Sequence, residues 1–75
     1  MVISMAESWI FTFGSGQKYE GYFVRIFGTY NTARKKMFDK YGREWCMQYS
    51  EKEWESWLER KPNWVPAEKE LEVLL

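Results

Sequence analysis

The fold is decided by residues 8–29, which read SWIFTFGSGQKYEGYFVRIFGT. Within this stretch, residues 8–13 and 22–27 are rich in aromatic and β-branched side chains and alternate in the way that strands do. The glycine-containing segment between them is too short for a crossover helix, so we predict that the two strands pair antiparallel. The alternation places three residues of the second strand on one face, namely Phe23, Arg25 and Phe27.

The residues that follow predict a helix and a third strand. Thr29 is suited to cap a helix that runs through Lys40, and Gly42 is suited to end it. Apolar side chains recur on one side of this helix and predict a buried stripe made of Tyr30, Ala33, Met37 and Tyr41. Beyond the helix, residues 44–49 alternate again and predict the third strand.

The last third of the chain predicts a second helix and a closing strand. Ser50 and Glu53 have the spacing of a capping box, and Pro62 limits the helix that this box begins. Residues 70–75 alternate like a closing edge strand, and the alternative is a short helix that begins at Pro66. The order β-β-α-β-α-β predicts one α+β domain over residues 1–75, with a flexible N-terminus at residues 1–7. We expect a small antiparallel sheet of three to four strands with both helices on one face.

The composition favours binding over catalysis. Fifteen of the 75 residues are Trp, Tyr or Phe, which supply large contact areas in cores and interfaces. The chain has no histidine, and its single cysteine, Cys46, has no cation directly beside it in sequence to activate the thiol. We therefore predict that the protein is not an enzyme, and we assign no catalytic residue, no cofactor and no metal ligand.

Charge is balanced overall but unevenly distributed. Eleven basic and eleven acidic side chains give a formal net charge of zero, which argues against strong non-specific nucleic-acid binding. Residues 1–50 hold seven Lys or Arg against four Asp or Glu, whereas residues 51–75 hold four against seven, so the surface should present one basic and one acidic patch. The lone cysteine and the lack of a long apolar run predict a cytosolic protein that does not contact membranes.

Two short helices on one face would leave part of the other sheet face open as a contact site. On the second helix, three glutamates recur every four residues and form a carboxylate row with a spacing of roughly 6 Å, similar to the phosphates of a nucleic-acid strand. Such a row could mimic DNA and block a DNA-binding enzyme, although it is also typical of ordinary solubilising charge. The residues predicted to bind the partner are Phe23, Arg25, Phe27, Glu51, Glu55, Glu59 and Trp64.

Two alternatives from other classes stay open. One is a single-stranded nucleic-acid-binding domain that uses Phe23, Arg25 and the cations of the first helix, although the sequence favours a protein partner over direct nucleic-acid binding. The other is a homodimer that forms through the open sheet face or an edge strand.

Short motifs spread over residues 9–73 carry a resemblance to a known family. They are WIFTFGSGQ at 9–17, Gly28-Thr29, Ala33-Arg34 with Met37, Tyr41-Gly42, Trp45, QYSE at 48–51, and Glu53-Trp54. The chain resembles a family of short uncharacterised proteins carried by phages and mobile elements of Gram-positive bacteria, although Asn31 and Thr32 stand where such proteins often have acids. The resemblance implies a phage context in the host cytosol. By analogy, it implies an inhibitor of a host defence or DNA-processing enzyme, such as a nuclease, a DNA glycosylase or a CRISPR effector.

Overall fold

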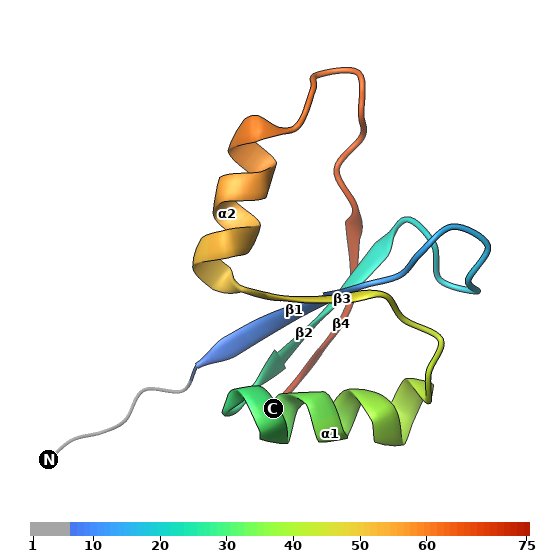
Figure 1. Ribbon diagram of the computed structural model, residues 1–75, viewed down its shortest axis with the longest axis vertical. Coiled ribbons are helices and arrows are strands. Elements are labelled where there is room, and N and C mark those ends of the chain that lie inside the picture. Colours follow the sequence, from blue (N-terminus) through green and yellow to red (C-terminus); the bar gives the residue numbers. More distant parts are fainter. Residues whose placement is uncertain (1–6) are drawn as a thin grey trace, which may run out of the picture.

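The computed structural model describes residues 7–75, which form a four-stranded sheet with two helices (Figure 1). The predicted α+β class and the order β-β-α-β-α-β are confirmed. The predicted flexible segment at residues 1–7 lies outside the described residues, except for Glu7, whose carbonyl accepts a hydrogen bond from the Gly28 N–H. The elements are β1 (Ser8–Thr12), β2 (Tyr22–Phe27), α1 (Tyr30–Tyr41), β3 (Met47–Ser50), α2 (Glu51–Arg60) and β4 (Lys69–Leu74).

The sheet is mixed rather than antiparallel, with the strand order β3-β1-β2-β4. β1 pairs antiparallel with β2 and with β3. β4 pairs parallel with β2, because residues 61–68 return the chain to the start of β2, where the Lys69 N–H donates to the Gly21 carbonyl. The prediction of an antiparallel sheet was therefore wrong for β4, since alternation along a strand contains no information about its direction.

The two helices cover opposite faces of the sheet, which corrects the prediction that both lie on one face (Figure 1). The face under α1 holds a buried cluster of Phe11, Phe13, Val24, Ile26, Ala33 and Met37. The face under α2 holds a second cluster of Ile10, Phe23 and Trp54. Because β1 and β2 carry apolar side chains on both faces, each face needs its own cover.

Local side chains set the ends of the helices. The Thr29 hydroxyl accepts a hydrogen bond from the Thr32 N–H at the start of α1, and Gly42, with a φ of 63°, ends that helix. Ser50 and Glu53 form the predicted capping box at the start of α2. These contacts lie within a few residues in sequence, so both helix starts were predictable.

Candidate binding groove

The residues predicted to form an open sheet face are largely held beneath α2. Phe23 is buried, and its ring lies against Trp54 with the centroids 5.1 Å apart. The Arg25 guanidinium lies 5.7 Å from the Phe23 ring centroid, and Phe27 is half-buried at the end of β2. The prediction that Phe23 and Arg25 lie on an open face of the sheet was wrong, because α2 covers that face.

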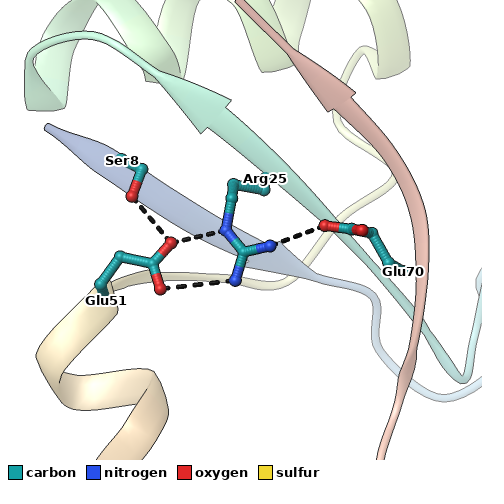
Figure 2. Close-up of polar contacts among 4 residues, drawn as sticks. All are labelled: Ser8, Arg25, Glu51 and Glu70. Carbon is teal, nitrogen blue, oxygen red and sulfur yellow. Dashed lines mark hydrogen bonds and ion pairs between the residues drawn. The ribbon is translucent and has the colours of Figure 1, made fainter. Parts of the chain in front are cut away.

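A network of ion pairs and hydrogen bonds around Arg25 joins β1, β2, α2 and β4, as Figure 2 shows. Its Nε lies 2.6 Å from Glu51 Oε2 on α2, and its Nη1 lies 2.7 Å from Glu70 Oε2 on β4. The Ser8 hydroxyl on β1 donates to the same Glu51 carboxylate at 2.7 Å. The hydrogen bond from Arg25 lowers the pKa of Glu51, although burial opposes this shift, and the same bond raises the pKa of Arg25. The network fastens α2 and β4 to the middle of the sheet.

The other predicted contact residues lie apart from this network. Glu55 and Glu59 are exposed along α2, and neither forms an ion pair within residues 7–75. Trp64, in the connector between α2 and β4, is 82% exposed. The structure therefore brings together only Phe23, Arg25 and Glu51 from the predicted set, and it leaves two unpaired carboxylates in the acidic row instead of three.

A groove that our sequence analysis missed lies between α1 and β3, with a volume of about 450 Å³. One wall comes from three α1 residues spaced four apart, which share one side of the helix: Tyr30, Arg34 and Phe38. The other wall comes from the α1–β3 connector and from β3 itself: Arg43, Trp45, Cys46, Met47 and Gln48.

The second wall forms because the chain turns tightly after α1. The Glu44 N–H donates to the Tyr41 carbonyl, so β3 begins at Met47 and not at Glu44 as predicted. Trp45 follows this turn, and its ring meets Phe11 edge to face at a centroid distance of 5.2 Å. The indole is thereby anchored to the core while it lines the groove.

Arg34, in the α1 wall, contacts residues of the other wall. Its guanidinium carbon is 5.0 Å from the Trp45 ring centroid and 5.6 Å from that of Phe38. Its Nη1 donates to Gln48 Oε1 at 3.2 Å, and Gln48 Nε2 donates to the Tyr30 carbonyl at 3.2 Å. These contacts hold the walls in one arrangement before any partner arrives, which reduces the entropy lost on binding.

The groove exposes apolar surface. Tyr30 is 46% exposed, Phe38 is 40% exposed and Met47 is 47% exposed. The prediction that Tyr30 belongs to the buried stripe of α1 was wrong, whereas Ala33 and Met37 are buried as predicted. Tyr30 sits at the first position of the helix and turns toward the groove wall instead.

The groove is also basic. Arg34 and Arg43 line it, and no Asp or Glu side chain does. Lys35 and Lys40, elsewhere on α1, each form an ion pair with a carboxylate. The acidic helix α2 lies on the opposite face of the sheet from α1.

A sequence signal for the groove existed. Tyr30, Arg34 and Phe38 recur at helical spacing beside the stripe that faces the core, and they alternate aromatic, cation and aromatic. Trp45 and Met47 follow on the next extended segment. None of these residues indicates a binding site when taken alone. They lie close together only because α1 packs beside β3.

Within residues 7–75, neither helix has the length and apolar character that crossing a bilayer demands. Over the same residues, no three His, Cys, Asp or Glu side chains converge as they would to hold a metal ion. Comparisons with protein-family models, with curated proteins and with solved structures find no match to this chain.

Proposed function

We propose that the protein is a non-catalytic binding protein that engages another protein through the groove between α1 and β3. The observation that carries this proposal is the lining of the groove, which combines three aromatic rings, a methionine and two arginines. Tyr, Trp and Arg supply much of the binding energy of protein interfaces, and Met is enriched there. The lack of histidine in the sequence supports a role without catalysis.

The arrangement of the rings favours a protein over a nucleic acid as the partner. The Arg34 guanidinium lies over Trp45, and Phe38 meets that indole nearly perpendicularly, with 70° between the ring planes. Bases need open ring faces on which to stack. The alternative built on Phe23 and Arg25 loses support as well, because the ring is in the core and the cation is paired with two carboxylates.

The resemblance to phage and mobile-element proteins predicts the kind of partner. On that prediction, the chain inhibits a host defence or DNA-processing enzyme in the host cytosol. Inhibition by DNA mimicry would rest on Glu55 and Glu59 alone, because the Glu51 carboxylate is paired with Arg25. The basic groove supports contact with an acidic surface of the partner instead.

The test compares two matched substitutions in affinity capture from a Gram-positive host lysate. Phe38→Glu introduces a carboxylate inside the groove, and Trp64→Glu makes the same kind of change at an exposed aromatic outside it. We expect Phe38→Glu to lose a protein that the unchanged chain captures and Trp64→Glu to retain it, with circular dichroism confirming that both are folded. The reverse outcome would place the contact on the connector and contradict the proposal.

A further inference from the structure

The groove borders an edge strand of the sheet that carries no charged side chain and no proline. β3 is an edge strand, so the backbone N–H and C=O groups along its outer side have no partner strand among residues 7–75. Its residues, Met47–Ser50, include no charged side chain and no proline, which are two of the common means of preventing edge pairing. The opposite edge, β4, carries Lys69, Glu70 and Glu72 and has an irregular register against β2. The two edges therefore differ, and β3 is the one suited to accept another strand.

We propose that the protein binds an acidic, extended segment of its partner as a fifth strand added to β3. This inference rests on the proposed function, because it uses the same groove and specifies what enters it. β3 spans four residues, or about 13 Å at the usual rise of a strand, so the added segment would pair over about four to six residues. Main-chain hydrogen bonds would supply affinity, and side chains in the groove would supply selectivity.

The groove determines which side chains the segment should carry. Every second residue of an added strand points to the α1 side of the sheet, where Tyr30 and Phe38 offer apolar surface. Arg43 forms no ion pair within residues 7–75, and the polar side-chain contact of Arg34 there is to the neutral Gln48. Both cations are thus available to carboxylates, and no acidic side chain of the groove competes for them.

The alternative occupants fit less well. Two copies that paired through β3 about a twofold axis would bring Arg34 and Arg43 of both chains toward one seam, where like charges repel. A nucleic acid could meet these arginines, but it has no strand backbone with which to extend the sheet. Both occupants enter the experiment as outcomes that contradict the proposal.

The experiment measures binding of labelled peptides to the full chain by fluorescence anisotropy. The probes are peptides of about ten residues in which Glu and Leu alternate, beginning with either residue. A second set has Lys in place of Glu, and a third set carries a central Pro. We expect the best Glu peptide to bind at least about tenfold more tightly than its Lys counterpart. We expect the central Pro to weaken binding about tenfold, because it removes a main-chain donor.

Two charge reversals on the protein give a matched comparison. Arg43→Glu removes an exposed groove cation and should weaken binding of the Glu peptide about tenfold. Lys35→Glu makes the same change in charge outside the groove, at a side chain that is 76% exposed, and should alter binding less than about threefold. Equal effects of the two variants would mean that only overall charge is sensed, and would overturn the proposal.

Two signals report where the peptide sits. The bound Glu peptide should slow hydrogen exchange at β3 amides, and it should protect the thiol of Cys46, the only cysteine in the chain, from alkylation. The proposal is overturned if no Glu peptide binds, if Glu and Lys peptides bind alike, or if oligothymidylate displaces the peptide without protecting β3. Protection of β3 without peptide, together with a dimer in sedimentation, would assign the edge to a second copy.

The outcomes separate this inference from the proposed function. If capture from lysate depends on Phe38 while no acidic peptide binds, the groove contact stands and the added strand is wrong. If Phe38→Glu leaves capture unchanged, both proposals fail.

Discussion

Replacing Glu51 with Gln removes the charge that ties α2 to the sheet while keeping the size of the side chain. Hydrogen bonds to charged groups contribute about 1.5–3 kcal/mol when shielded, and fully exposed ion pairs about 0–1 kcal/mol. The Arg25 and Glu51 side chains are 27% and 34% exposed, so this pair lies between those limits. We expect a loss of about 1–1.5 kcal/mol, which lowers the Tm of a domain this small by about 5–10 °C.

Urea denaturation, monitored by tryptophan fluorescence, measures this loss in the free energy of unfolding. Glu55→Gln is the control variant. Glu55 lies one turn further along α2, is exposed and forms no ion pair within residues 7–75. Its replacement should change the free energy of unfolding by less than about 0.5 kcal/mol. A double-mutant cycle of Glu51→Gln with Arg25→Met should give a coupling of about 1 kcal/mol.

The dependence of folding stability on pH gives a second test of the ion pair between Arg25 and Glu51. The pKa of Glu51 is lowered in the folded protein, so its contribution is complete above the ordinary carboxyl value of about 4.3 and is lost as the pH falls through the lowered value. The difference in the free energy of unfolding between the unchanged protein and Glu51→Gln should therefore shrink as the pH falls below about 4.3. Equal losses from Glu51→Gln and Glu55→Gln, or a difference that persists unchanged in acid, would refute the structural role of the network.

Three further predictions follow from burial and pairing. Trp54→Ala should cost about 3–5 kcal/mol, since this side chain is only 3% exposed, and near-ultraviolet circular dichroism should show lost tertiary structure. Burial and the hydrogen bond to Glu72 raise the pKa of Tyr41, so stability should decline above about pH 10, where the unfolded chain ionises first; Tyr41→Phe should flatten that decline in urea titrations. Reversing Glu55 and Glu59 to Lys should leave the Tm nearly unchanged and partner capture intact, whereas lost capture would favour the acidic row over the groove.

Much of the secondary structure was predictable because it depends on neighbours in sequence. β2 has the predicted bounds, and β1 ends one residue short of them. The capping box of Ser50 and Glu53 forms as expected, and α2 ends at Arg60, before Pro62. Alternation, helix caps and proline act over a few residues, so their effects can be predicted from the sequence alone.

The predicted contact residues were misplaced for the opposite reason. Nothing near Arg25 in sequence indicates that a carboxylate 26 residues away will bind it, nor that Trp54 will cover Phe23. An exposed row of the sheet was inferred from two helices sharing one face, and that inference failed when each helix took its own face. Residue type was interpreted correctly there, but availability to a partner depends on what lies above the residue.

By itself, the sequence determined the α+β class, the starts of both helices, and a repertoire of rings and charges without histidine. Only the tertiary structure decided that β4 runs parallel to β2 and that Glu51 forms an ion pair with Arg25. It also decided that Tyr30, Arg34 and Phe38 line one groove with β3. The division has one physical cause. Backbone propensities and caps are local, whereas strand direction, helix placement and ion pairing arise from contacts between distant segments that form together when the chain folds.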